Sequence, residues 1–325
     1  GDISNLQYLL FINKYASRSY NDTNQYPVMP WLKLKNNYER NLLYSTVAQT
    51  ETQRDYLVTK YDMSFGGFKN HFNIHLSNSS FVIYYLVRIN PFTNGQITLQ
   101  NGKFDSPNRQ FSSIEDCLNI FERSNDSREL IPHFFISQEF FYNYNCNFYG
   151  FRERTQKVVH ELTVFIKEQQ LLNSKCPNRD ILPITYITQN ERDLNSQYVR
   201  EHLHYFINNI FGSGQVGKRE DCNTFDKYCY QEMINLHSKI EEYKSKKMEY
   251  ADIKEKIDRK INKVLSFGQT PYKIFEVPHP PSELKQNQID NNNNTKTEIN
   301  NDNKNQKIIF LKISQKKLVI FTSQQ

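Results

Sequence analysis

The sequence predicts a mainly α fold in which helices pack around extended core segments that belong to no sheet. Two observations predict it. Apolar residues recur at helical spacing in four places, and the stretch SRSYNDTNQYPVMPW at 17–31 contains two prolines that exclude a regular helix. The hydrophobic fraction is only 38%, but it includes 21 Tyr and 23 Phe, so the core should be rich in aromatic rings.

Two helices are predicted from capping boxes, in which a Ser hydroxyl and a Gln or Glu side chain three residues later satisfy each other's backbone N–H groups. The first box pairs Ser4 with Gln7, and the second pairs Ser112 with Glu115. The region between these helices is expected to be less regular. One face of the first helix carries Ile3, Leu6, Leu9, Leu10, Asn13 and Ala16, and the second helix carries Ile114, Leu118 and Phe121 inward.

Two more helices are predicted from apolar stripes and stop signals. One covers about 197–211 and ends at Gly212, and a long one ends near Leu265, before Gly268 and Pro271 stop it. Their stripes are Val199, Leu203, Phe206, Ile207 and Ile210 in the former, and Ile253, Ile257, Ile261 and Val264 in the latter.

The stretch 17–31 is predicted to run extended through the interior. Tyr26 and Met29 each precede a proline, which disfavours helical geometry, and the rings of the stretch need burial. Asn, Asp and Thr side chains can satisfy backbone groups that have no ladder partner. We therefore interpret the stretch as a hydrogen-bonded structural spine and partner-docking region, formed by Tyr20, Asn21, Asp22, Gln25, Tyr26 and Trp31.

The net charge of +6 is not concentrated in the main body of the chain. Residues 284–325 hold seven lysines and three acidic residues, which leaves a net charge of +2 for 1–283. The densest charge run, 238–263, mixes nine basic with six acidic residues and is typical of a solvated helix. A nucleic-acid-binding protein would gather its Lys and Arg on one face. Nucleic-acid binding through the basic tail is therefore kept only as an alternative function.

No motif gives positive support to an enzyme. GSGQVG at 212–217 matches the dinucleotide-binding fingerprint, but it follows a predicted helix instead of the strand that the fingerprint requires. A nucleotide-binding enzyme is therefore the third hypothesis, and we expect no catalytic, cofactor or metal site. The five cysteines lack metal or redox spacing, and the longest apolar run, at 81–87, is too short to span a bilayer. We expect a cytoplasmic protein.

Three regions are predicted along the chain. Residues 1–283 form the main domain, and the Asn-rich segment 284–306, which has no periodicity, forms a linker. Residues 307–325 contain KIIFLKIS and KLVIF, two short strands that open a further β domain. Because the chain begins with Gly1 and not Met, we expect it to be a piece of a longer protein.

Several spaced segments resemble a BEACH domain, the module shared by beige/Chediak-Higashi-type and neurobeachin-type proteins. The resemblance covers nearly all of 1–283. In chain order the segments are ISNLQYLLFINKYASRSYNDTNQYPVMPW (3–31), SNSSFVIYYLVRINPFT (77–93), NGKFDSPNRQF (101–111), SRELIPHFF (127–135), DILP (180–183), YVREHLHYFINNIFGSGQVG (198–217) and FGQTPYKIFEVPHPP (267–281).

The resemblance implies a large, mostly helical domain with extended core segments outside regular sheets. It also implies a pleckstrin-homology-like domain before it and a WD-repeat β-propeller after it, whose first strands would lie at 307–325. Proteins of this family act as non-enzymatic scaffolds in vesicle traffic, lysosome or granule biogenesis and autophagy, with other trafficking proteins as partners and peripheral association with intracellular membranes. The segments 36–50, 69–77 and 182–186 depart from the family pattern.

Mild proteolysis of the chain should cut first between Gln286 and Gln306, because nothing in that polar segment offsets the entropy lost on ordering it. Mass spectrometry of the early fragments measures the position. A first cut within 198–265 would contradict the predicted boundaries.

Overall fold

The structure is a computed structural model that describes residues 3–64, 67–104, 109–123, 126–147, 182–282, 306–314 and 317–324. For Glu122, Arg123 and the last two ranges it describes the backbone alone. The chain divides into two units, 1–282 and 283–325, which are described separately. The predicted linker lies outside the described residues, apart from its last residue, Gln306.

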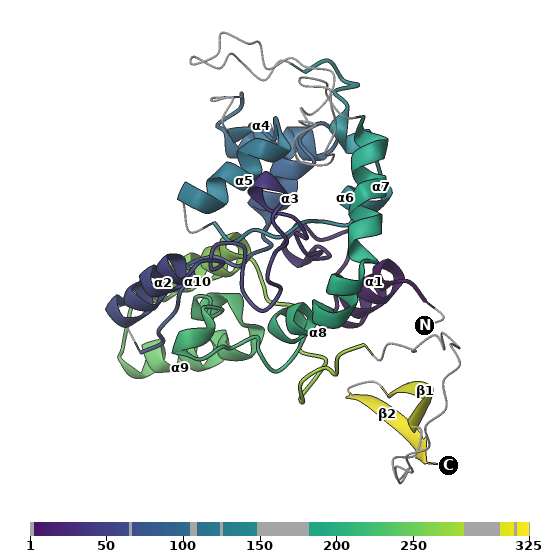
Figure 1. Cartoon of the computed structure of the whole chain (residues 1–325). Helices are drawn as coiled ribbons and strands as arrows, with labels where there is room; N and C mark the ends of the chain where they lie inside the picture. The colour runs from purple at the N-terminus through teal and green to yellow at the C-terminus, as the bar shows by residue number, and fades with distance from the viewer. Residues whose placement is uncertain are drawn as a thin grey trace, which may run out of the picture. The chain divides into compact units, whose positions relative to one another are not determined.

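The first unit is mainly helical, as predicted (Figure 1). The longer helices are α1 Asn5–Tyr15, α2 Glu51–Met63, α3 Ser79–Tyr85, α4 Phe92–Leu99, α5 Ile114–Arg123, α7 Pro183–Leu194, α8 Gln197–Phe211, α9 Leu236–Ser245 and α10 Tyr250–Phe267, and α6 is the single turn His133–Ile136. Short 3-10 turns join them: η1 Thr23–Gln25, η2 Lys35–Asn37, η4 Glu139–Phe141, η6 Arg219–Asp221, η7 Lys227–Cys229 and η8 Gln231–Met233.

The capping signals define the starts of the predicted helices closely. Both bonds of the first capping box form at α1, at 3.0 and 3.2 Å between Ser4 and Gln7. α8 has the predicted length, and all five residues of its apolar stripe are buried. At α5 the cap is one residue later than predicted, because Ser113 Oγ accepts from the backbone N–H of Asp116. Its three inward residues are buried as expected.

Two findings refine the expectations about the helices. The region between α1 and α5 is less regular, as expected, but it contains the three helices α2, α3 and α4 among the described residues. α2 even begins with a capping box, in which Thr50 and Gln53 exchange bonds of 3.0 and 3.2 Å. The long helix ends close to the predicted residue, but its apolar stripe is only partly covered, and α10 buries none of its side chains fully.

Gly268 ends α10 for a reason that only the packing explains. Its φ of +78° is a conformation that favours glycine, and an added Cβ would lie 2.5 Å from the carbonyl oxygen of Ser77. The chain can therefore turn sharply at the end of α10 while it packs against the start of α3.

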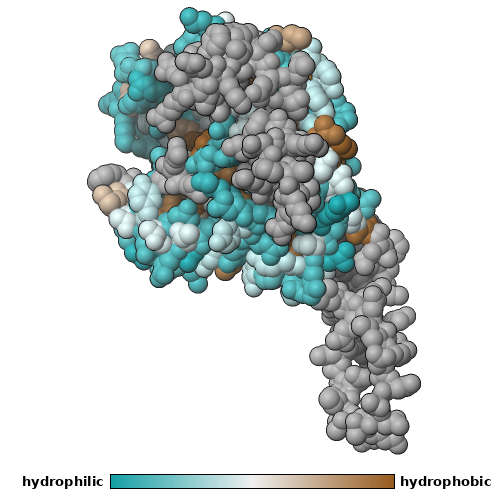
Figure 2. All heavy atoms as spheres, turned by 45° about the horizontal axis from the view of Figure 1, so that its top comes forward, coloured by the Kyte–Doolittle hydropathy of each residue, from teal (hydrophilic) through white to brown (hydrophobic). Residues whose placement is uncertain are grey.

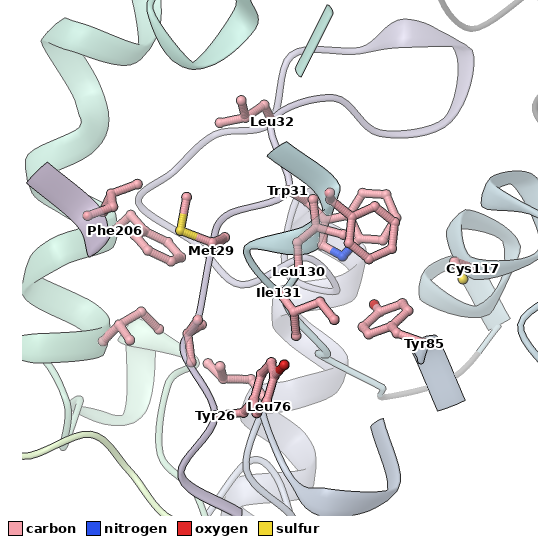
Figure 3. Close-up of a cluster of buried hydrophobic side chains, with 14 of the residues drawn as sticks. Tyr26, Met29, Trp31, Leu32, Leu76, Tyr85, Cys117, Leu130, Ile131 and Phe206 are labelled. Carbon is pink, nitrogen blue, oxygen red and sulfur yellow. The ribbon is translucent and has the colours of Figure 1, made fainter. Parts of the chain in front are cut away.

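Extended segments run between the helices and form part of the core. Residues 26–32 pass between α8 and the segment that carries Leu130 and Ile131 (Figure 3). A second such segment pairs Phe72 with Phe225 in an isolated parallel bridge, and most residues of the divergent stretch 69–77 are buried. The largest fully buried side chains are all aromatic, so the prediction of a ring-rich core is confirmed: Trp31, Tyr26, Tyr85, Phe72, Phe111, Phe134, Phe135, Phe140, Phe141, Phe206 and Phe211.

The second unit contains the two predicted strands. β1 Gln306–Ser314 and β2 Lys317–Gln324 pair antiparallel, from Gln306 opposite Gln324 to Ser314 opposite Lys317. A hairpin of this kind is compatible with the start of a propeller, and that assignment stays a prediction. Within the described ranges of the chain, no helix has the length and apolar character needed to cross a membrane.

Replacing Trp31 by Ala should lower the free energy of unfolding by about 3–5 kcal/mol. The side chain is 1% exposed and its ring packs on Phe121 and Phe134, at centroid distances of 5.4 and 6.0 Å. Urea unfolding measures the change. The matched control is Tyr38→Ala, at a ring that is 72% exposed, which should change stability by no more than about 0.5 kcal/mol. A loss below about 1 kcal/mol for Trp31→Ala would show that the ring is not part of the core.

Candidate functional site

The predicted spine divides into a buried part and a surface loop. Tyr26 and Trp31 are buried and the backbone there is extended, as predicted. Tyr20, however, is 47% exposed, and Asn21 and Asp22 are also exposed, so their predicted burial is wrong. The reason is local: the turn η1 closes a loop in which the backbone N–H of Ser19 donates to Gln25 O at 2.9 Å.

Asn13 satisfies backbone groups of the buried extended segment, a role that was predicted for the polar residues within 17–31. Its side chain acts as a strand partner for Val28, accepting from Val28 N at 2.7 Å and donating to Val28 O at 2.9 Å. Met29 next to it exchanges two backbone bonds of 2.9 Å with Leu130. The sequence did contain a signal for Asn13, because this polar residue lies on the predicted apolar face of the first helix.

A buried ion pair satisfies the next peptide groups of the segment. Trp31 N donates to Glu129 Oε2 at 3.1 Å, and Arg40 Nη1 donates to Trp31 O at 3.3 Å. Arg40 and Glu129 also bind each other in a two-pronged pair at 2.6 and 2.7 Å, with both side chains almost wholly buried. Burial raises the pKa of Glu129, while Arg40 acts to lower it.

The sequence analysis missed this ion pair. Arg40 lies in the divergent segment 36–50, and its backbone N–H donates to Leu32 O at 3.1 Å. Glu129 lies in SRELIPHFF, where a single acid stands before an apolar run. That position was the one available signal, because nothing in the sequence shows that two residues 89 positions apart are neighbours.

The buried side chain of Arg18 holds the loop 19–25 in place. Its guanidinium donates to the carbonyls of Asn24 and Tyr26, at 3.3 and 3.4 Å, and to that of Gln269. Burial lowers the pKa of Arg18 to about 9, and the negative charge of Asp22 acts against this shift, so the side chain is cationic at neutral pH. The loop is thereby tied to the segment that follows α10.

Three exposed residues, Tyr20, Asn21 and Asp22, form what we call the loop surface. The Tyr20 ring rests edge-on against Tyr26 at 5.4 Å and against His133 at 6.1 Å between centroids. Asp22 caps η1 by accepting from Asn24 N at 2.8 Å. The loop surface is therefore a small patch on a rigid base.

GSGQVG forms the loop after α8, as its context predicted. Gly212 ends that helix, and no strand precedes the motif. Gln215 is buried, and its amide donates to the carbonyls of Ile210 and Pro271 at 2.6 and 2.7 Å. The motif thus joins the end of α8 to the segment that follows α10, and it lacks the strand-to-helix geometry that places a pyrophosphate. In the part of the chain that the structure describes, no three His, Cys, Asp or Glu side chains gather as a metal site requires.

Lowering the pH from 7 to 5 should destabilise the protein, by up to about 1.4 kcal/mol per pH unit for each of two histidines. Burial lowers the pKa of His75 to about 3 and that of His133 to about 4. In the unfolded chain both take up a proton below about pH 6.5, whereas in the folded chain both stay neutral. This contribution to stability is therefore complete above pH 6.5 and is lost as the pH falls towards 4.

Urea unfolding at several pH values measures this dependence. Because His133→Asn removes one of the two groups, that variant should show a smaller slope. The raised pKa values of Glu129 and Asp193 act in the opposite direction. Burial also lowers the pKa values of His71, His204 and His279, which adds to the loss of stability on acidification. Equal stability at pH 7 and pH 5 would contradict the assignment of neutral buried histidines.

Comparison with known proteins identifies the family. Residues 1–282 match the Beige/BEACH domain. Similar proteins are Beige protein homolog 1 of Schizosaccharomyces pombe, 31% identical over 298 residues, Beige protein homolog 1 of Saccharomyces cerevisiae, 33% over 303 residues, and BEACH domain-containing protein B of Arabidopsis thaliana, 31% over 300 residues. Each match covers 86% of this chain but only 10%, 13% and 10% of the relative, respectively. The motifs found in the sequence and the match over 1–282 agree, and the chain belongs to the Beige/BEACH domain family.

Proposed function

We propose that this chain supplies the scaffold domain of a large protein in membrane traffic, with roles in lysosome or granule biogenesis or in autophagy. One observation carries the proposal: the polar groups around the buried segment 26–32 are committed to holding backbone, which leaves a rigid exposed loop surface beside them. A site of this kind recognises a partner by shape and needs no reacting group. Membership of the family and the proportion of the relatives that the chain covers support the same role within a longer protein.

The partner that we propose for the loop surface is a pleckstrin-homology-like domain preceding residue 1 in the same protein. Tyr20 has the character of an interface anchor, since its ring is large and half exposed, and it is held in place by Tyr26 and His133. Asn21 and Asp22 beside it offer polar contacts at the rim. Interfaces between domains of one chain bury roughly 600–1,500 Å², so this surface would be the centre of a larger contact.

Hydrophobic side chains are scattered over the visible face of the protein. Among the coloured residues of Figure 2 they lie in separate small groups between hydrophilic ones. This distribution favours several limited contacts, such as those with the preceding domain, a following WD-repeat propeller and other trafficking proteins. We also propose a cytoplasmic location with peripheral attachment to intracellular membranes.

The two other function classes have less support. A nucleic-acid-binding role would depend on the basic tail, whereas the run 238–263 pairs several of its cations with carboxylates in α9 and α10. A nucleotide-binding enzyme would depend on GSGQVG, whose glutamine side chain is occupied by backbone carbonyls.

The docking proposal predicts that Tyr20→Ala weakens binding of the preceding domain, added in trans, by about tenfold or more, since an interface anchor contributes about 2 kcal/mol. The unfolding free energy of residues 1–325 alone should change by less than about 1 kcal/mol, because the ring is half exposed. Calorimetry measures the binding, and urea unfolding measures the stability. Asp22→Ala should reduce both, through the lost cap and the lost charge near Arg18.

The control for this experiment is Tyr38→Ala, which removes an equally large exposed ring from a different loop. If the preceding domain neither binds nor raises the melting temperature, or if both tyrosine variants bind equally well, the docking surface lies elsewhere.

A further inference from the structure

Three lysines surround the side chain of Tyr228. Their Nζ atoms lie 5.5 Å (Lys227), 5.6 Å (Lys260) and 5.3 Å (Lys263) from the centre of its ring. Lys260 also donates a hydrogen bond to the phenol oxygen at 3.0 Å. Lys227 belongs to η7 and the other two belong to α10, so packing of these two elements creates the cluster.

Tyr228 is held in place independently of the lysines. Its backbone N–H donates to Asp226 Oδ1 at 2.9 Å, and its carbonyl accepts from Gln269 Nε2 at 2.8 Å. The ring packs edge-on against Phe267, with 6.3 Å between centroids. The phenol is therefore a fixed point towards which three flexible side chains converge.

The three ammonium groups form no ion pair within the described part of the chain. No carboxylate oxygen there lies within 4.0 Å of any of the three Nζ atoms. Several cations in or beside α9 and α10 do have such partners: Lys239 and Lys246 pair with Glu242, Lys244 with Glu241, and Arg259 with Glu255. Lys247, Lys254 and Lys256 also lack such a partner among the described residues, so what distinguishes the cluster is that three unpaired cations converge on one ring.

The three lysines affect the pKa of the Tyr228 hydroxyl. Burial acts to raise the pKa of Tyr228, but the hydrogen bond from Lys260 and the charges of Lys260, Lys227 and Lys263 together lower it. Lys227 and Lys263 are exposed, and Lys260 and Tyr228 are half buried, so a ligand from solvent can reach the cluster. Cation–π attraction explains why single lysines approach the ring, but it does not favour three like charges around one ring.

We propose that Lys227, Lys260, Lys263 and the Tyr228 hydroxyl form a binding site for a phosphate group. The ammonium groups donate charge-assisted hydrogen bonds to the phosphate oxygens. Because Lys260 donates to the phenol oxygen, the phenol O–H is free to point outward and donates to the same ligand. This site is separate from the loop surface and does not depend on the docking proposal.

A phosphate group can come from a lipid headgroup or from a free phosphate compound, and the experiment separates the two sources. The whole 325-residue chain, labelled with ¹³C at its tyrosines, is titrated with inorganic phosphate and followed by the NMR signal of Tyr228, assigned with Tyr228→Phe. In parallel, the chain is sedimented with phosphatidylcholine vesicles with and without a phosphoinositide. The proposal predicts a saturable shift of Tyr228 that weakens as sodium chloride is added.

Charge-neutral variants identify the residues responsible. Lys260→Gln and Lys263→Gln should each weaken phosphate binding by about tenfold, as expected for the loss of one charge-assisted hydrogen bond. Lys254→Gln on the same helix is the matched control and should change the affinity less than about twofold. Circular dichroism verifies that every variant keeps its helices.

Each outcome decides the matter. A shift with phosphate together with phosphoinositide-dependent sedimentation supports the site with a lipid as its source, and a shift without sedimentation supports it with a free phosphate compound. Sedimentation that Lys260→Gln and Lys263→Gln abolish but Lys254→Gln does not also supports a lipid source. No shift and no sedimentation, or equal losses for Lys254→Gln and Lys260→Gln, would overturn the proposal, since general positive charge would then explain any binding.

Discussion

The structure depends on satisfying the peptide groups of an extended segment that is buried and has no sheet around it. A buried N–H or C=O without a partner costs about 1–3 kcal/mol, so such a segment needs substitutes for a β ladder. Here side chains act as substitutes. Asn13 forms hydrogen bonds with the peptide groups of Val28, and Arg40 and Glu129 form them with the peptide groups of Trp31. Met29 and Leu32 have backbone partners of the ordinary kind, Leu130 and Arg40 respectively. The two prolines in the segment reduce the number of N–H groups that need partners.

This arrangement joins parts of the chain that are far apart in sequence. Asn13 comes from α1, Arg40 from the loop before α2, and Glu129 from the segment before α6. Removing one partner of a buried ion pair leaves the other charge uncompensated, at a cost of roughly 3–5 kcal/mol, so neither residue can be changed alone without loss. Replacement of both by apolar groups would avoid the charge but leave the peptide groups of Trp31 unsatisfied. The pair is therefore both an electrostatic contact and a structural substitute for a strand.

Gln269 forms hydrogen bonds with residues that support both the loop surface and the lysine cluster. Its carbonyl accepts from Arg18, which holds the loop surface, and its amide donates to the carbonyl of Tyr228, which carries the lysine cluster. Gly268 permits the sharp turn that places this glutamine in the interior. One short segment after α10 thus supports a shape-based contact and a charge-based contact. Both sites rest on buried polar side chains, and neither needs a reacting group.

The sequence by itself determined the elements whose cause is local. Capping boxes and apolar stripes specify α1 and α8 almost to the residue, and the prolines of 26–31 specify extended backbone, because these signals act between residues a few positions apart. The mainly helical class follows from such signals, whereas the family was inferred from the resemblance of spaced sequence segments to BEACH domains. Only the tertiary structure decided which polar residues hold the buried segment and which face solvent: Tyr20 and Asp22 were expected inside, whereas Arg40 and Glu129 lie there. The sequence likewise did not predict that Lys227 gathers with Lys260 and Lys263, since only the latter two lie in the mixed-charge run 238–263. The physical reason is that burial and pairing of charges depend on neighbours in space, and the sequence alone does not specify which residues those are.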